Sequence, residues 1–390
     1  MRRLVGAVAT LALLLVAWPG PAGAAGAGPA PSWSVDPVPN PAGATVSNLG
    51  GVSCYTTGGC VSVGNTAASL SSPGAGLVES SNHGTWTIGD PRQPARATSS
   101  GLRAVSCVGP RHCVAIGTLS TSSGPGTSFS ERWNGTRWSL DRTTEPPGGH
   151  GAELLGLSCT AADACTAVGS FTEAGRQHAL AERWNGKTWS VQSVPGVPNS
   201  LFDRLYGVSC TAAGCVAVGY ESGNGNASAY AVSWNASGWH LDVVPEPAQE
   251  THSELFAVSC AAAADCTAVG SYGTARLGLM LAESWNGTSW SLETVPEPAG
   301  VEDGELSAVS CPSSAVCEAV GYYFTSNLGP PTAFAARLAG STWHLQTIAT
   351  PAGTVASTML GVDCIGLSAC TAVGYFQTPT EVLALADRYS

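Results

Sequence analysis

Apolar and small or polar residues alternate along this chain in short stretches, and the pattern predicts strands. In one typical stretch, Leu205–Cys210, alternation is followed by a short turn and a second run, Cys215–Gly219. Short runs of this kind, bounded by turn residues, are typical of β-strands. No helical periodicity occurs after the first 25 residues. The pattern therefore predicts an all-β protein.

The strand pattern occurs seven times. A segment with two cysteines, followed by Ala-Val-Gly or a variant, recurs with its first cysteine at 54, 107, 159, 210, 260, 311 and 364. Each copy contains four short predicted strands, which is typical of a β-propeller blade. We expect the blades to start near residues 46, 99, 151, 202, 252, 303 and 356.

A second motif predicts a hairpin between the third and fourth strands of most copies. Its pattern is Trp-Asn-Gly-x-x-Trp, as in ERWNGTRWSL at 131–140. Asn-Gly between apolar strands favours a type I′ turn, because both central residues of that turn need positive φ. The motif therefore predicts a tight turn at each Asn-Gly.

The seventh copy lacks a fourth strand of its own. Residues 385–390 align with 180–185, where a third strand ends, whereas residues 33–43 match 290–300, a fourth strand with its linker. We therefore expect a seven-bladed β-propeller with four antiparallel strands per blade, closed by an N-terminal strand at 32–38 that completes the last blade. Closure removes the exposed sheet edges that promote aggregation.

All fourteen cysteines fall into the seven pairs, one pair in each repeat. One pair per repeat predicts a disulfide within each blade, formed in an oxidising compartment. The alternative, a thiolate metal site, needs four converging ligands. The predicted bonds are Cys54–Cys60, Cys107–Cys113, Cys159–Cys165, Cys210–Cys215, Cys260–Cys266, Cys311–Cys317 and Cys364–Cys370.

The first 24 residues have the order of a secretory signal peptide. Arg2 and Arg3 precede an apolar run at 4–18, and small residues follow at 22–24. The run is short for a membrane span, although an uncleaved anchor is the alternative. We therefore expect a signal peptide at 1–24, a propeller at 25–390, a secreted extracellular protein, and no membrane association after cleavage.

Composition argues against some partners. The formal net charge is −11, only 11% of residues are charged, and no basic stripe occurs, so nucleic acid is not an expected partner. The 12 tryptophans and 44% hydrophobic residues are sufficient to build a core. We expect a monomer without a metal or cofactor.

The candidate site lies where the first strands begin. These strand starts converge at one mouth of a propeller channel, and the aromatic residues that follow the second strands lie on the same face. Carboxylates, arginines and aromatic rings together predict a site for a polar ligand or glycan. In the alternative, the rings cover the blade ends and the acids are solvated. The candidates are Glu153, Arg204, Glu254 and Glu305, with Arg103, Tyr206 and Phe256 beside them.

Three functions are consistent with this site. The first is a non-catalytic module that binds an extracellular glycan, cell-wall polymer or protein. The second is a carbohydrate-active enzyme, a glycoside hydrolase or lyase, that uses carboxylates such as Glu254 and Glu305. The third is a purely structural role. Because no HExxH, GxSxG, SxxK or phosphate-loop pattern occurs, we assign no catalytic residue.

The repeat VSC-x5-C-x-AVG, followed by W-N-G-x-x-W, resembles the secreted propeller-repeat proteins of actinobacteria and related bacteria over residues 31–390. More distantly, it resembles Asp-box and kelch repeats. The first resemblance implies a propeller fold and an extracellular location, with no established reaction. The turn departs from the Asp-box of sialidase-type propellers: asparagine replaces aspartate and the spacing to glycine is shorter. No arginine triad or Tyr-Glu pair can be assigned, so sialidase activity is not implied.

Overall fold

The alternating apolar and polar residues of each repeat form strands, as predicted, and the residues that the structure describes contain no helix. The computed structural model describes residues 31–122, 124–223, 225–274, 277–326 and 329–390. The predicted signal peptide at 1–24 lies outside the described residues. Residues 32–390 form one compact unit. No part of the chain that the structure describes forms an apolar helix long enough to span a membrane.

Each repeat contributes strands of four kinds. The first strands are β2 (Val46–Thr56), β6 (Ser99–Gly109), β10 (His150–Ala161), β14 (Phe202–Cys210), β18 (His252–Ala262), β22 (Asp303–Ser313) and β26 (Ala356–Gly366). The second strands are β3 (Gly59–Ala67), β7 (His112–Thr121), β11 (Ala164–Glu173), β15 (Cys215–Ser222), β19 (Asp265–Gly273), β23 (Val316–Phe324) and β27 (Ala369–Gln377). The third strands are β4 (Ala75–Asn82), β8 (Gly124–Trp133), β12 (Arg176–Trp184), β16 (Ala227–Asn235), β20 (Gly278–Trp285), β24 (Thr332–Ala339) and β28 (Val382–Tyr389). The fourth strands are β5 (Thr85–Ile88), β9 (Trp138–Asp141), β13 (Trp189–Gln192), β17 (Gly238–Asp242), β21 (Trp290–Glu293), β25 (Thr342–Thr347) and β1 (Trp33–Asp36).

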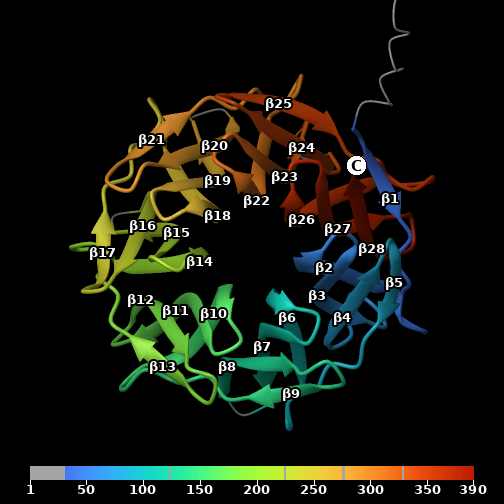
Figure 1. Ribbon diagram of the computed structural model, residues 1–390, viewed down its shortest axis with the longest axis horizontal. Helices are drawn as coiled ribbons and strands as arrows, with labels where there is room; N and C mark the ends of the chain where they lie inside the picture. The colour runs from blue at the N-terminus through green and yellow to red at the C-terminus, as the bar shows by residue number, and fades with distance from the viewer. Residues whose placement is uncertain (1–30, 123, 224, 275–276, 327–328) are drawn as a thin grey trace, which may run out of the picture. The chain divides into compact units, whose positions relative to one another are not determined.

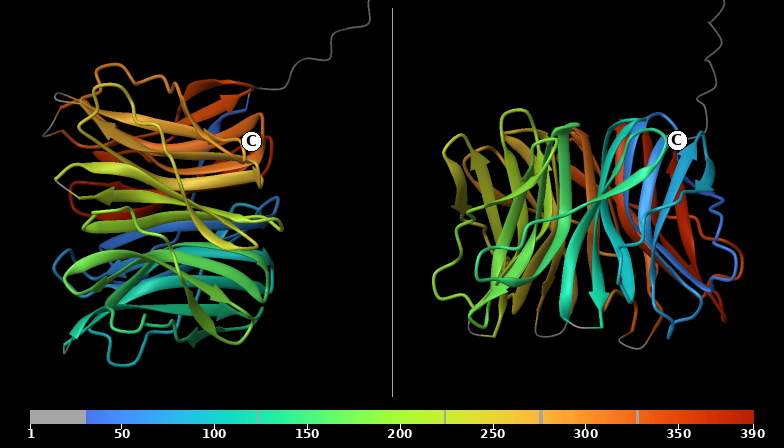
Figure 2. Two further views of the ribbon diagram at one scale, coloured as in Figure 1. Left: turned by 90° about the vertical axis from the view of Figure 1, so that its left-hand side faces the viewer. Right: turned by 90° about the horizontal axis from the view of Figure 1, so that it is seen from below.

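Antiparallel pairing joins the four strands of each repeat in order. We number the repeats 1 to 7 by their first strands, from β2 to β26. In repeat 7 the fourth strand is β1, which pairs with β28 from Trp33 opposite Tyr389 to Asp36 opposite Ala386. Figure 1 shows the first strands nearest the centre and the fourth strands at the periphery of this unit. The architecture is β-propeller-like, and the side views show the strands running between its two faces (Figure 2).

The hydrophobic core is divided into clusters that lie between consecutive repeats. Leu205 of β14 is fully buried against Val168 and Ala181 of repeat 3. The same packing joins Leu49 of repeat 1 to Val373 of repeat 7. Each repeat therefore buries its apolar faces only by packing against its two neighbours.

A ladder of side-chain hydrogen bonds connects neighbouring first strands. The backbone N–H of each repeat's first cysteine donates to a side-chain oxygen of the preceding repeat, as Cys210 does to Ser158 at 3.0 Å. Six acceptors are serines and one is Asp363, which accepts from Cys54 at 2.6 Å. The other bonds are Cys107 to Ser53, Cys159 to Ser106, Cys260 to Ser209, Cys311 to Ser259 and Cys364 to Ser310.

The seven predicted disulfides are all present. Each one joins a first strand to the second strand of the same repeat, next to the turn between them. All seven lie on one face of the unit, which we call the disulfide face. The first strands begin on the opposite face.

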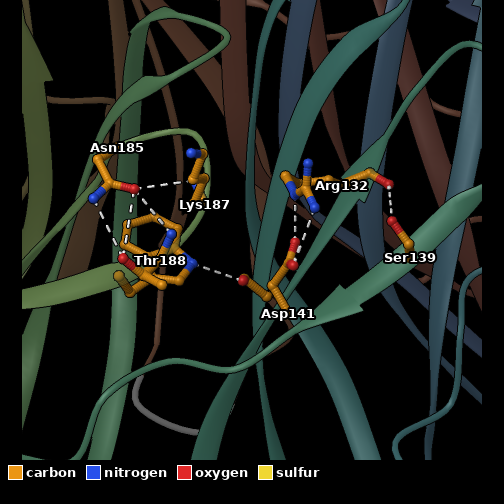
Figure 3. Close-up of polar contacts among 8 residues, drawn as sticks. Arg132, Ser139, Asp141, Asn185, Lys187 and Thr188 are labelled. Atoms are coloured by element: carbon orange, nitrogen blue, oxygen red, sulfur yellow. Dashed lines mark hydrogen bonds and ion pairs between the residues drawn. The ribbon is translucent and has the colours of Figure 1, made fainter.

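The prediction of type I′ turns at Asn-Gly is wrong for the Trp-Asn-Gly repeats. The side-chain oxygen of Asn185 accepts from the N–H groups of Lys187 at 3.0 Å and Thr188 at 2.9 Å (Figure 3). Only Gly186 in this turn has positive φ, at 89°. The asparagine side chain thus holds a longer turn, because it satisfies backbone groups that a two-residue turn would pair across the strands.

Carboxyl groups on the third strands are buried between repeats. Glu131 and Glu182 each accept one backbone N–H from the linker before their repeat. Glu79 and Glu283 are fully buried and have no hydrogen-bond partner among the described residues. Burial raises the pKa of both to about 8, so each is neutral in the folded protein below that pH.

Deletion of residues 31–39 should destabilise the protein, because it removes the pairing of β1 with β28 and the contact of the Trp33 and Tyr389 rings at 5.4 Å. Trp33→Ala alone should cost about 3–5 kcal/mol. Thermal unfolding followed by circular dichroism measures both effects. Ser34→Ala, at an exposed position of β1, is the control and should change stability by less than about 0.5 kcal/mol. A truncated protein as stable as the full chain would contradict the pairing.

Stability should fall as pH rises from about 4.5 to about 8. An unfolded glutamate ionises near pH 4.5, whereas Glu79 and Glu283 keep their protons to about pH 8 when folded. Folding above pH 4.5 therefore requires proton uptake, which costs up to about 1.4 kcal/mol per pH unit for each group. Urea unfolding at pH 5 and pH 8 measures the slope. Glu79→Gln and Glu283→Gln should each flatten it, and an unchanged slope in the double variant would refute this origin.

Candidate functional site

The predicted site position of each first strand pairs with the residue that directly follows the Ala-Val-Gly motif, or its variant, on the second strand. Arg204 lies opposite Tyr220 on the second strand, and Glu305 lies opposite Tyr322. A Cβ on Gly219 would overlap the backbone oxygen of Arg204. The glycine of each Ala-Val-Gly motif therefore lets the two strands approach closely at this position.

A β-bulge follows this position in every first strand. The register shifts between Leu205 and Gly207, which leaves Tyr206 outside the regular pairing, and equivalent shifts occur in the other six repeats. Bulges of this kind redirect a side chain. The bulged residues are Gly50, Arg103, Leu155, Tyr206, Phe256, Ser307 and Leu360.

Arg204 connects repeats 3 and 4. Its guanidinium lies 2.8 Å from a carboxylate oxygen of Glu153 and 5.4 Å from the ring centroid of Tyr206. The Tyr206 ring stacks on Tyr220 at 5.8 Å and meets Phe256 edge-on at 5.5 Å. A cation, a carboxylate and three rings are thus held together by contacts that cross from one repeat to the next.

Two further carboxylates extend this group. Burial raises the pKa of Glu254, while the charges of His252 and Arg204 and a hydrogen bond from Tyr206 oppose the shift. Burial also raises the pKa of Glu305, against hydrogen bonds from Ser307 and Tyr322. The negative charge of Glu254 contributes to the raised pKa of Glu305. We call the whole set the inner-strand cluster: Glu153, Arg204, Tyr206, Tyr220, Glu254, Phe256, Glu305 and Tyr322.

The cluster is confined to repeats 3–6. The equivalent first-strand positions in repeats 1, 2 and 7 are Asn48, Gly101 and Thr358, which carry no charge. Arg103 lies apart from the cluster: it is exposed and lines a separate cleft of about 290 Å³ between repeats 1 and 2. Six of the seven predicted ligand-binding residues therefore lie in one group, and Arg103 does not.

Sequence reasoning did not assign His252 to the site. This residue precedes Glu254 by two positions, and side chains two apart on a strand face the same side. The alternation of side chains along a strand could therefore have predicted that His252 lies near Glu254. Asp303 bears the same relation to Glu305 and also contributes to its raised pKa.

The cluster can bind a ligand through three kinds of contact. The carboxylates accept hydrogen bonds from hydroxyl groups, the guanidinium donates hydrogen bonds, and the aromatic rings offer apolar surface. The described residues include no group of three or more His, Cys, Asp or Glu that could hold a metal ion.

Solved structures show what fold the chain shares. It is similar to a GH74 xyloglucanase from Xanthomonas campestris, with a TM-score of 0.51, 12% identity, and coverage of 91% of this chain and 53% of the other. It is also similar to a PL25 ulvan lyase, a polysaccharide lyase, with a TM-score of 0.51, 11% identity, and coverage of 85% and 90%. No protein-family model matches the chain, and neither does any curated protein. At these identities the likeness establishes the fold alone.

Tyr206→Phe should raise the pKa of Glu254 further, because it removes a hydrogen bond that stabilises the ionised carboxylate. Carbon-13 NMR titration of the glutamate side chains measures this change. The control is Tyr272→Phe on β19, whose hydroxyl lies in the field of Glu297 and should leave Glu254 unaffected. An unchanged or lowered pKa in Tyr206→Phe would show that Tyr206 does not support the carboxylate.

Proposed function

We propose that this chain is an exported, seven-bladed β-propeller, closed by β1, that binds an extracellular glycan at the inner-strand cluster without catalysing its cleavage. One observation carries the proposal. Four consecutive repeats bring Arg204 and Tyr206 among carboxylates on a scaffold whose other repeats carry uncharged residues at the same position. A repeat protein that departs from its own pattern at one place has a candidate binding surface there.

Closure is supported by two contacts between repeats 7 and 1 and by the position of β1. The hydrogen bond from Cys54 to Asp363 continues the ladder across this boundary. Leu49 packs with Val373 in a shared core cluster. β1 supplies the fourth strand of repeat 7.

Export is supported by the seven disulfides, which form and persist in oxidising compartments. The predicted signal peptide at 1–24 and the resemblance to secreted propeller-repeat proteins agree with this location. We accordingly expect the natural ligand outside the cell.

A glycan suits the cluster better than an apolar ligand or an anionic polymer. Sugars present hydroxyl groups to carboxylates and arginine, and C–H faces to aromatic rings. The carboxylates of Glu153, Glu254 and Glu305 outnumber the single guanidinium of Arg204, which disfavours a strongly anionic ligand. Because two proteins of similar fold are a xyloglucanase and an ulvan lyase, polysaccharides are the class to test first.

Binding is favoured over catalysis because the cluster's groups already satisfy one another. Arg204 is paired with Glu153, and Glu305 accepts hydrogen bonds from Ser307 and Tyr322. The alternative is a glycoside hydrolase or lyase in which Glu254 is a proton donor. The raised pKa of Glu254 supports that alternative, since a general acid needs its proton near neutral pH.

A glycan array followed by turnover assays on the bound sugars tests the proposal. We expect binding without new reducing ends or unsaturated products. Arg204→Gln should weaken binding by about tenfold or more, because it removes a charged hydrogen-bond donor and leaves Glu153 without its partner. Arg137→Gln, at an exposed position in the turn between β8 and β9 of repeat 2, is the charge-matched control and should bind like the parent protein.

Two results would reject the proposal. Turnover that is lost in both Glu254→Gln and Glu305→Gln would establish the enzyme. Glycan binding that Arg204→Gln leaves unchanged would move the site away from the inner-strand cluster.

A further inference from the structure

One position at the end of the third strand carries a large side chain in six repeats and a serine in repeat 1. This position lies directly opposite the second cysteine of its repeat, as Trp184 lies opposite Cys165. From repeat 1 to repeat 7 the residues are Ser81, Trp133, Trp184, Trp234, Trp285, Leu338 and Tyr389. Repeat 1 therefore lacks the ring that five other repeats place here.

An arginine precedes this position in four repeats, and three of these arginines cover the ring of the next repeat. The contacts are Arg132 over Trp184 at 4.9 Å, Arg183 over Trp234 at 5.1 Å and Arg337 over Tyr389 at 5.1 Å. The fourth is Arg388 of repeat 7, whose next repeat is repeat 1. The register therefore sets Arg388 beside Ser81, where no ring is present.

A cleft of about 250 Å³ lies at this point between repeats 7 and 1. Ser81, His83, Asp36 and Arg388 line it, together with the disulfide residues Cys60 and Cys370. Arg388 lies 3.3 Å from Asp36 at the cleft. A guanidinium, a carboxylate and an apolar lining therefore surround the space beside Ser81.

The boundary between repeats 2 and 3 shows the same arrangement with its ring present. Arg132 pairs with Asp141 (Figure 3). Arg388 pairs with Asp36 in the same way. A cleft of about 300 Å³ occurs there too, but neither Trp184 nor Asp141 lines it. Their counterparts Ser81 and Asp36 do line the cleft of repeat 1. The cleft between repeats 7 and 1 thus includes the space equivalent to the one that the indole of Trp184 fills between repeats 2 and 3.

We infer that the cleft between repeats 7 and 1 binds one planar aromatic ring of the indole class in the position that tryptophan holds in other repeats. The ring would lie beneath Arg388, as Trp184 lies beneath Arg132. An apolar cavity of roughly 150 Å³ is sufficient to bind benzene, so the space is large enough for one ring. The cleft is on the disulfide face, so the inference is independent of the proposed glycan site.

Fluorine NMR with 5-fluoroindole as the probe tests the inference, because the protein contributes no signal. We expect saturable binding of one equivalent. Arg388→Gln should weaken the affinity by about tenfold, since it removes the cation above the ring. Ser81→Trp should fill the cleft, abolish binding and raise the melting temperature. Cyclohexylmethanol, an apolar ring without π electrons or an N–H, should compete poorly.

Two further variants make the test decisive. Ser81→Leu introduces the side chain of repeat 6 and should also block the probe, so it replaces Ser81→Trp if that protein does not fold. Trp184→Ser removes the ring beneath Arg132 and should add a second equivalent of bound probe. The inference is overturned if 5-fluoroindole does not bind at millimolar concentration, or if it binds Ser81→Leu as well as the parent protein. Loss of glycan binding would not affect either outcome.

Discussion

A hydrogen bond from each first cysteine to a side-chain oxygen of the preceding repeat joins all seven first strands to one another. A first strand is the inner edge of its sheet, so one side of its backbone has no partner strand. The serine of the Val-Ser-Cys motif supplies an acceptor for one of these N–H groups, as Ser158 does for Cys210 at 3.0 Å. This bond fixes how far apart neighbouring first strands lie. At repeat 7 the acceptor is Asp363, which also accepts from Ser310 at 3.3 Å.

Because the ladder and the disulfides hold one end of every first strand, the opposite end is free to vary. Two local features restrict the chain at that end. A glycine such as Gly219 is required where two strands approach closely, and a bulge turns Tyr206 out of the pairing. Neither requirement restricts the side chain at the position of Arg204. Charged and aromatic residues can therefore gather in repeats 3–6 without disturbing the core, which lies between the sheets.

The sequence alone was sufficient to predict the all-β fold, the seven disulfides and the strand that pairs with β28. Each depends on a pattern that recurs from one repeat to the next. The turn at Asn185 was predicted wrongly because a side-chain hydrogen bond replaced the expected backbone geometry. The separation of Arg103 from the inner-strand cluster could not be predicted, because it depends on distances between repeats. The sequence analysis did not single out Ser81, because its meaning depends on the arginine contact across the repeat boundary.

Hydrogen bonds between neighbouring repeats also occur far from the centre, at the buried carboxyl groups of the third strands. Glu131 accepts the backbone N–H of a linker residue of the preceding repeat. At the equivalent linker position before repeat 4 the residue is Pro195, which has no N–H, and the third strand carries Val232 in place of the acid. Repeat 5 combines a proline, Pro245, with an acid, Glu283, and burial raises the pKa of that acid to about 8. Burial also raises the pKa of Glu131 and Glu182, to about 7, although each keeps its backbone donor. A raised pKa is therefore common among framework carboxyls here, so the inner-strand cluster is identified by its contacts and not by titration.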